Sequence, residues 1–366
     1  MIKPYIGAEE EYFLVDRQSK QILRDPPQAL FDACMRALPE LNRELFCGQI
    51  ELASKKCASI TKLHDELCRS RQLLQETLKQ FKAVFVAAST YPTLISANQV
   101  CTPSPRYLHI LNQFHGAIQN YACNALHVHV NLPSKRQRIS VLKKLNCFLP
   151  MFLALSSSSP FYDNALMGLQ SYRIQLLQAF PVSGFVEPFN TLQEYKKTVR
   201  LYGKIGFTDD ESNLYWHARL GFKLPTIETR IMDVCPRIED SIALAALTQS
   251  LIYTLTKRSP NALPFYTDKI SYLRYYLWQA RRYPIPSMTF IDFNKNDSLS
   301  FVDAVDQLLE FVAKAAKKIG CLDQLHHIKS IASNGTSADR QAACFKQTND
   351  INAVCQQLID ESNQLP

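Results

Sequence analysis

Two histidines separated by a single residue constrain the fold of this chain more than any other feature. They lie in residues 126–132, where apolar residues, two of them valines, alternate with polar ones. This alternation predicts a β-strand, in which residues two apart share one face. His127 and His129 therefore face the same space. Two imidazoles on one face suit either a metal or phosphate site or a histidine pair satisfied within the core.

Two further strand-like stretches repeat this spacing with charged residues. Glu9 and Glu11 lie two apart near the N-terminus, and Glu228 and Arg230 lie two apart in residues 226–233. Carboxylates repel one another away from bulk water unless a positive charge lies between them. The three strands together thus favour a cation-binding site over an ordinary core.

Composition is typical of a globular protein without a membrane span. A chain of 366 residues with 46% hydrophobic residues can form a substantial core in one large domain or two smaller ones. No apolar run approaches the roughly 20 residues that cross a bilayer, and no signal-peptide core follows the start. The 11 cysteines are odd in number and scattered without a CxxC pair, which predicts free thiols in the cytoplasm.

The net charge of +8 raises the question of nucleic-acid binding. The densest basic patch, residues 135–138 with Lys143 and Lys144, is short and has no interleaved aromatic residues. It falls where a helix is expected to begin, so a solvated helix face explains it better, and we expect no nucleic-acid partner. A positive balance also suits a cleft that attracts nucleotides or carboxylates.

The remaining pattern predicts an α+β fold. Residues 46–53 alternate like a strand, in which Glu51 is either a surface residue of an edge strand or part of the site. Strands in which apolar and polar residues alternate usually have one face covered and the other open to a cleft. We therefore predict helices packed around a mainly antiparallel sheet. Helices are expected over residues 136–156, 240–257, 267–283, 298–319 and 338–362.

Domain organisation follows from this distribution. We predict a single catalytic domain over residues 1–366, in which residues 1–257 carry the sheet. Residues 258–366 are expected to form a helical C-terminal part packed on that sheet-bearing core.

Seven short motifs, in their order and spacing, resemble those of the glutamate–cysteine ligase type 2 family of bacterial carboxylate–amine ligases. They span about residues 5–283 and are G-x-E-x-E, I-E-L-A, H-V-H-V, A-L-S-x-x-S-P-F, S-x-R, F-P-x-S-G and T-x-E-x-R-x-x-D. The resemblance implies a fold like that of glutamine synthetase and guanido kinases. In that fold a curved, mainly antiparallel sheet forms a cup, helices pack outside it, and ATP and divalent metals bind inside.

The resemblance also implies an ATP- and Mg²⁺-dependent reaction. A carboxylate, which is the γ-carboxylate of glutamate in the best-known members, attacks the γ-phosphate of ATP and forms an acyl phosphate. An amine then displaces phosphate and forms an amide bond. The expected partners are these small molecules, with no membrane and with a homodimer as the candidate assembly.

The resemblance assigns roles to particular side chains. Oxygen ligands suit Mg²⁺, and arginines can neutralise the charge on a transferred phosphoryl group or clamp a phosphate or a substrate carboxylate. The expected metal ligands are Glu9, Glu11, Glu51, His127 and Glu228. The expected nucleotide contacts are His129, Arg230, Ser171 and Arg173. The expected catalytic residues are Arg230, Arg219 and Glu228.

Four positions depart from the family pattern. Cys47 stands where the family usually has a second glutamate, Tyr91 replaces the histidine of G-T-H-P, Leu166 replaces the aspartate of a G-T-D turn, and His217 replaces the aspartate of W-D-x-R. A thiolate is a poor Mg²⁺ ligand. The departures leave open a ligase with another amine or acid, or a catalytically weakened member that binds a nucleotide or a partner.

The histidine pair alone offers a third alternative, a zinc-dependent hydrolase with imidazole ligands and a carboxylate as general base. That class predicts a barrel of regularly alternating strands and helices. The helical pattern of the C-terminal third disfavours it.

Overall fold

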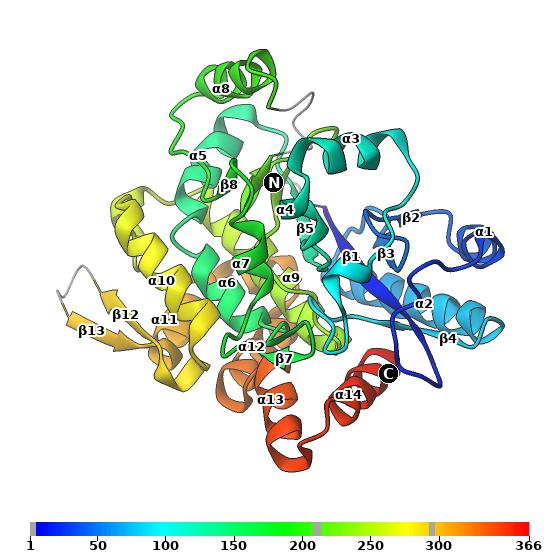
Figure 1. Cartoon of the computed structure of the whole chain (residues 1–366). Helices are drawn as coiled ribbons and strands as arrows, with labels where there is room; N and C mark the ends of the chain where they lie inside the picture. Colours follow the sequence, from blue (N-terminus) through cyan, green and yellow to red (C-terminus); the bar gives the residue numbers. More distant parts are fainter. Residues whose placement is uncertain (1–4, 208–213, 293–296, 366) are drawn as a thin grey trace.

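A seven-stranded sheet lies at the centre of the computed structural model, which describes residues 5–207, 214–292 and 297–365 (Figure 1). Its strand order is β10-β11-β5-β1-β3-β2, and β4 also pairs with β1. All of these neighbouring strands are antiparallel. The strands are β1 (Ile6–Asp16), β2 (Leu41–Arg43), β3 (Gln49–Ala53), β4 (Ala83–Val86), β5 (Leu126–Asn131), β10 (Ala218–Leu220) and β11 (Thr226–Thr229).

Strand β1 is the longest strand and pairs with three others. Its first half lies against β5, its middle against β3 and its end against β4. The pairing places Glu9 opposite His127 and Glu11 opposite Glu51. Because directly paired residues of antiparallel strands lie on the same face, these side chains meet.

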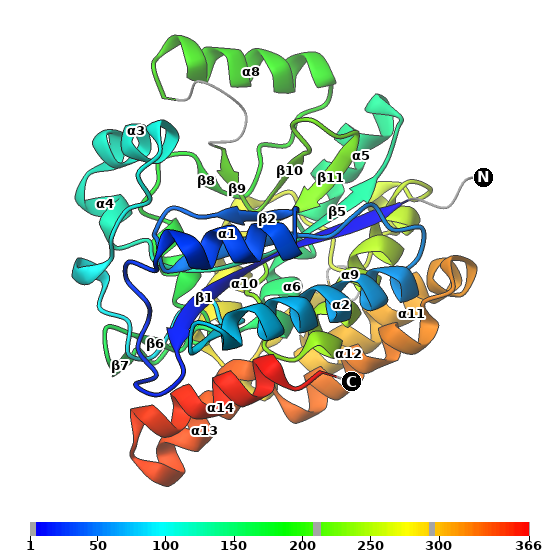
Figure 2. The ribbon, with the colours of Figure 1, turned by 90° about the vertical axis from the view of Figure 1, so that its right-hand side faces the viewer.

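Helices cover the other face of the sheet. Helices α2 (Ile60–Lys79) and α9 (Ile238–Leu255) pack against β1, β4 and β5, and α11 (Phe301–Ile319) and α12 (Leu322–Asn334) pack on α9. Figure 2 shows α2, α9 and α12 below β1, with α3 and α8 above it. Helix α9 is buried along almost its whole length, and most of its residues are apolar or small. The mainly antiparallel sheet with helices outside confirms the predicted α+β class.

The remaining elements surround this core. The other helices are α1 (Gln28–Ala37), α3 (Pro105–Phe114), α4 (Gly116–Gln119), α5 (Lys135–Leu145), α6 (Leu149–Ser156), α7 (Arg173–Leu177), α8 (Leu192–Lys204), α10 (Ile270–Arg282), α13 (Ser337–Thr348) and α14 (Ile351–Asn363). Three two-stranded pairs are β6 (Phe161–Tyr162) with β7 (Ala165–Leu166), β8 (Ser183–Gly184) with β9 (Tyr215–Trp216), and β12 (Thr289–Asp292) with β13 (Asp297–Ser300).

The single helix predicted over residues 136–156 is wrong, because the chain breaks it into α5 and α6. The side chain of Asn146 leaves the helix and its Nδ2 donates to the carbonyl of Val186 at 2.8 Å. Pro150 falls in the first turn of α6, where a missing N–H is tolerated. No single helix among the described residues is long and apolar enough to span a membrane. Helices α5 and α6 reach that length and apolar character only when they are taken together, and a 65° bend separates them. The helical spacing of apolar residues continues through the break, so this spacing did not indicate that the helix ends there.

The helix predicted over residues 338–362 also divides in two. Asn349 ends α13 with a φ of 50°, a left-handed conformation that asparagine tolerates, and the side chain of Asp350 caps α14. The predicted C-terminal part also contains the β12–β13 hairpin. Its separation from the sheet-bearing core at residue 257 stays a prediction.

The middle residue of the Glu9-Glu10-Glu11 run points away from its neighbours, into the core. The Glu10 carboxylate accepts from Arg71 Nε at 3.0 Å and Nη2 at 2.7 Å, and both side chains are fully buried. Arg71 also donates to the carbonyls of Cys235 and Pro236, just before α9. Burial alone would raise the pKa of Glu10, but Arg71 outweighs it and holds this pKa below its usual range. The pair therefore ties β1 to α2 and to the start of α9.

Candidate active site

Acidic and basic side chains cross five neighbouring strands on the sheet face that α2 and α9 leave uncovered. Strand pairing sets Arg219 opposite Glu228, Glu228 opposite His129, and Glu11 opposite Glu51. The structure thus brings all five predicted metal ligands to one face. We call the four carboxylates Glu9, Glu11, Glu51 and Glu228 the acidic row.

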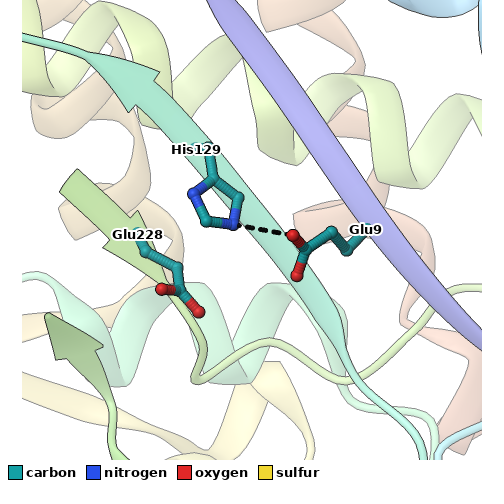
Figure 3. Close-up of side chains that lie close together, drawn as sticks. All are labelled: Glu9, His129 and Glu228. Atoms are coloured by element: carbon teal, nitrogen blue, oxygen red, sulfur yellow. Dashed lines mark ion pairs between the residues drawn. The ribbon is translucent and has the colours of Figure 1, made fainter. Parts of the chain in front are cut away.

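Glu9 lies between the two histidines of β5. His129 Nε2 is 3.1 Å from Glu9 Oε1 (Figure 3). His127 Nδ1 is 3.3 Å from Glu9 Oε2. Burial would raise the pKa of Glu9, but the two imidazoles outweigh it and hold this pKa well below its usual range. Burial, aided by the charge of Arg230, lowers the pKa of His127 to about 4. Near neutral pH Glu9 is therefore ionised and His127 is neutral.

A third carboxylate, from Glu44, joins Glu11 and Glu51 at the other end of the row. Glu44 lies between β2 and β3, and one carboxylate oxygen from each of the three residues lies within 4.8 Å of the others. Burial and the charge of Glu51 raise the pKa of Glu11 to about 8, while burial and the charge of Glu11 do the same for Glu44. Burial and the charge of Glu44 raise the pKa of Glu51 well above its usual range. Arg173, Arg230 and Arg106 oppose these rises in pKa but do not outweigh burial and the neighbouring carboxylates.

Glu44 was not predicted from the sequence. Its position bears on whether the cysteine at position 47 leaves the site without a carboxylate. The thiol of Cys47 is buried and accepts from Arg43 Nη2 at 3.6 Å, and it does not line the cavity beside the row. Glu44, three residues earlier, places a carboxylate there. A carboxylate from the segment that contains Cys47 therefore reaches the cavity even though Cys47 does not.

Three groups of side chains in and beside the acidic row can hold a cation, with ligand atoms within 4.8 Å of one another in each group. Glu9 and Glu51 each belong to two of them. Oxygen-rich donor sets suit Mg²⁺, and the raised pKa values of Glu11, Glu44 and Glu51 indicate a need for positive charge, so these residues fit a divalent cation. The groups are Glu9–His129–Glu228, Glu9–Glu51–His127 and Glu11–Glu44–Glu51.

Two arginines bind Glu228. Arg219 donates from Nε at 2.8 Å and from Nη2 at 3.1 Å, and Arg230 Nη1 donates to Oε1. Burial would raise the pKa of Glu228, but the two guanidinium groups outweigh it and hold this pKa below its usual range. Arg219 and Arg230 both line the cavity. Glu228 therefore orients two cationic groups toward the space above the row.

The two remaining predicted nucleotide contacts bind within the protein. Arg173 donates from Nη1 to the carbonyl of Ile231 at 3.0 Å and from Nη2 to that of Arg230 at 2.9 Å. Ser171 is fully buried and donates to Asp233 Oδ1 at 3.0 Å, away from both cavities described below. The geometry thus gives Arg173 a role in positioning Arg230. Ser171 is held by Asp233, and its nucleotide contact stays a prediction.

Two cavities lie along the row and share Glu9. The larger one, of about 410 Å³, contains Glu11, Glu44 and Glu51. The other, of about 300 Å³, lies beside His129. Five arginines and the α3–α4 segment also line the larger cavity, including Arg43, Arg106, Arg173, Arg219, Arg230, Tyr107 and Ile110. Mostly small or apolar residues line the smaller one, including Tyr5, Gly7, Ala8, Ala53, Leu224 and Pro225.

The other three departures from the family pattern lie outside both cavities. Tyr91 is buried, and its hydroxyl donates to the carbonyl of Lys20 at 3.0 Å. Leu166 is exposed on β7. His217 is buried, its ring nitrogens have no partner in the described part of the chain, and burial together with the charge of Arg173 lowers its pKa to about 3. None of the three removes a group from the acidic row.

Comparison with known proteins identifies the family of the chain. The model of the glutamate–cysteine ligase family 2 matches residues 5–357. A relative from Rhodospirillum rubrum, named "Putative glutamate--cysteine ligase 2", is 33% identical over 350 residues, which are 93% of this chain and 89% of the relative.

Two solved structures share the fold. A glutamate–cysteine ligase from Francisella tularensis in complex with AMP superimposes with a TM-score of 0.73 at 14% identity, over 100% of this chain and 90% of that one. A bifunctional glutathione synthetase from Pasteurella multocida gives a TM-score of 0.71 at 15% identity, over 98% of this chain and 52% of that one. At these identities the structures show the fold alone.

Proposed function

Because the chain belongs to the glutamate–cysteine ligase family 2, we propose that it is an ATP- and Mg²⁺-dependent carboxylate–amine ligase that forms a γ-glutamyl amide bond. One observation carries the proposal: three cation-binding groups linked through Glu9 and Glu51 lie on one sheet face, beside two arginines that Glu228 orients. Phosphoryl transfer needs this combination of cations and guanidinium groups around the phosphate.

The proposed chemistry has two steps. A carboxylate oxygen of the acid attacks the γ-phosphorus of ATP, and ADP leaves. The amine then attacks the acyl carbon, loses a proton and releases phosphate. Divalent cations held by the acidic row and its histidines would supply charge neutralisation at the phosphate oxygens. Arg230 and Arg219 stabilise the charge on the transferred group, and no protein side chain has to form a covalent bond.

The two cavities support a division of the substrates. We place the nucleotide base in the smaller cavity because its lining is mostly small and apolar, and because His129 and Glu9 border it. The acid and the amine then occupy the larger cavity, which holds the carboxylates and the arginines. Glu9 lines both, so the γ-phosphate would lie above it.

The first experiment measures phosphate release from ATP with Mg²⁺ and glutamate, screened against pools of amino acids and amines. We expect release that depends on one pool. The Glu228→Gln variant should lower the rate about 100-fold, because it weakens the hold on Arg219 and Arg230 and removes charge from one cation group. Release that persists at the wild-type rate in this variant would come from a contaminant or from another site.

A second prediction concerns the pH dependence of cation binding. Glu11 and Glu44 have pKa values raised to about 8, so below that pH a dication must displace protons from them. The affinity for Mg²⁺ should therefore rise from pH 6.5 to pH 8.5, with proton release during binding. Calorimetry in two buffers of different ionisation enthalpy measures both quantities. An affinity that is constant across this range contradicts the assignment of these carboxylates as ligands.

A catalytically weakened, nucleotide-binding protein is the second candidate, and Cys47 is the observation that favours it. It predicts ATP binding without phosphate release in any pool. Glu44 argues for the active enzyme, since it supplies the carboxylate that Cys47 lacks. We place the enzyme in the cytoplasm, which its 11 free cysteines support, and keep a homodimer as the candidate assembly.

A further inference from the structure

We propose that Arg106 binds a substrate carboxylate at the outer side of the larger cavity, and so selects substrates that carry a carboxylate besides the one that reacts. The inference rests on the proposed function, because it assigns a contact to a substrate of that reaction. Four observations support it.

Arg106 differs from the other arginines of the cavity because its guanidinium has no hydrogen-bond or ion-pair partner among the residues that the structure describes. Arg219 and Arg230 bind Glu228, and Arg173 binds main-chain carbonyls. Arg43 donates to Gln28 and to the thiol of Cys47. Over the described residues, the guanidinium of Arg106 has neither a hydrogen bond nor an ion pair, and it lies only 5.6 Å from the Tyr107 ring. Its donors are therefore available to a ligand.

The position of Arg106 in its helix does not explain it as a stabilising residue. It is the second residue of α3, directly after Pro105, and the first turn of this helix contains no acidic residue. The N-terminal end of a helix carries partial positive charge, so a cation there is unfavourable. The capping of α3 is already provided by Ser104, whose hydroxyl accepts from the backbone N–H of Tyr107 at 3.3 Å. The arginine adds nothing to the helix.

The charge of Arg106 acts across the cavity. Burial and the charge of Glu11 raise the pKa of Glu44, and Arg106 opposes that rise. Burial raises the pKa of Tyr215, and Arg230 and Arg106 both oppose it. Glu44, Tyr215 and Arg106 all line the larger cavity, so the charge of Arg106 reaches groups from separate parts of its lining.

The charges in the cavity leave a place for one more anion. The carboxylates of the row would be neutralised by cations, and the transferred phosphoryl group would be matched by Arg219 and Arg230. Two arginines of the lining then have no carboxylate partner among the described residues, Arg43 and Arg106. Arg43 donates to two other side chains, whereas the guanidinium of Arg106 has no such partner there and lies on α3, off the sheet that carries the row. A carboxylate remote from the reacting atoms suits it, since a guanidinium offers a planar fork of donors. Both an acid such as glutamate and an amine such as cysteine carry one.

The test compares Arg106→Met with Arg106→Lys, with Arg36→Met on the exposed side of α1 as the matched control. One arm uses hydroxylamine as the amine and compares glutamate with 4-aminobutyrate, which lacks the second carboxylate. The other arm keeps glutamate and compares cysteine with cysteamine. In one arm, we expect Arg106→Met to lower kcat/KM about tenfold for the compound with the carboxylate, and less than twofold for its partner.

The loss should appear in KM and not in kcat, because a contact remote from the reacting atoms is made equally before and during reaction. Arg106→Lys should recover part of it, and Arg36→Met should behave as wild type. The arm that responds identifies whether the acid or the amine supplies the carboxylate. An equal loss with and without the carboxylate, or no loss in either arm, overturns the proposal.

Failure of the proposed function gives a different result. If the wild-type protein turns over no substrate, calorimetry with Mg²⁺ and ADP present measures the binding of glutamate and of cysteine directly. Weaker binding of either compound to Arg106→Met than to wild type would support Arg106 while the ligase assignment fails. Equal binding to the two proteins, or no binding to wild type, overturns both.

Discussion

Replacing Glu51 by glutamine is expected to lower kcat/KM for ATP-dependent ligation by about 10³-fold. Glu51 belongs to two of the three cation groups, so its neutralisation weakens both at once. The measurement is phosphate release at saturating Mg²⁺, followed by a Mg²⁺ titration to see whether excess cation restores the rate.

The same variant should be more stable than wild type without cations. Burial and the charge of Glu44 raise the pKa of Glu51, so its ionised form opposes folding at neutral pH, and glutamine removes that repulsion. Mg²⁺ should raise the Tm of wild type more than that of Glu51→Gln. Glu76→Gln, on the exposed side of α2, is the control and should change neither property. An active Glu51→Gln enzyme would place the cations elsewhere.

Replacing Arg71 by methionine is expected to lower the free energy of unfolding by about 3–5 kcal/mol. The change leaves the Glu10 carboxylate buried without its cation and removes two donors to main-chain carbonyls near α9. Urea unfolding measures the loss. Arg69→Met, two residues earlier on α2, removes an exposed pair with Glu66 and should cost less than about 1 kcal/mol.

Two further measurements separate the ion pair from simple packing loss. Adding Glu10→Leu to Arg71→Met should recover part of the stability, because no unpaired charge stays buried. The pKa of Glu10 is lowered in the fold, so the stability from the pair is present above about pH 4.3 and is lost as the pH falls through the folded value. The double variant should therefore lose less stability in acid than wild type. Equal acid sensitivity would rule out the pair as the cause.

Most of the acidic row could be predicted because two residues that are two positions apart in a β-strand point to the same face of the sheet. Glu9 with Glu11 and His127 with His129 follow from this rule alone. Which strands lie side by side was not derivable from the local pattern, and the resemblance implied only that these carboxylates share one metal site. Glu44 was missed because it lies in a turn between two strands, where no period fixes the direction of a side chain.

The fold prediction failed where local chemistry interrupts a continuous apolar period. The pattern in residues 136–156 has no gap, yet the side chain of Asn146 binds the main chain of Val186 and Pro150 starts a new helix. Pro150 was visible in the sequence, but Val186 is 40 residues away from Asn146. Arg71 was missed for the same reason, since its partner Glu10 is 61 residues distant.

The buried pair of Glu10 and Arg71 has a consequence for how β1 finds its alignment in the sheet. Three consecutive glutamates look alike to neighbouring strands, so a slip by one residue would still present a carboxylate to the row. The slip would turn Glu9 and Glu11 into the core, where Arg71 can neutralise only one of them. An unpaired buried carboxylate costs several kcal/mol, so the shifted alignment is rejected. A guanidinium on the far side of the sheet thus adds to the buried Ile6, Ala8 and Tyr12 in specifying the register of the strand that carries the acidic row.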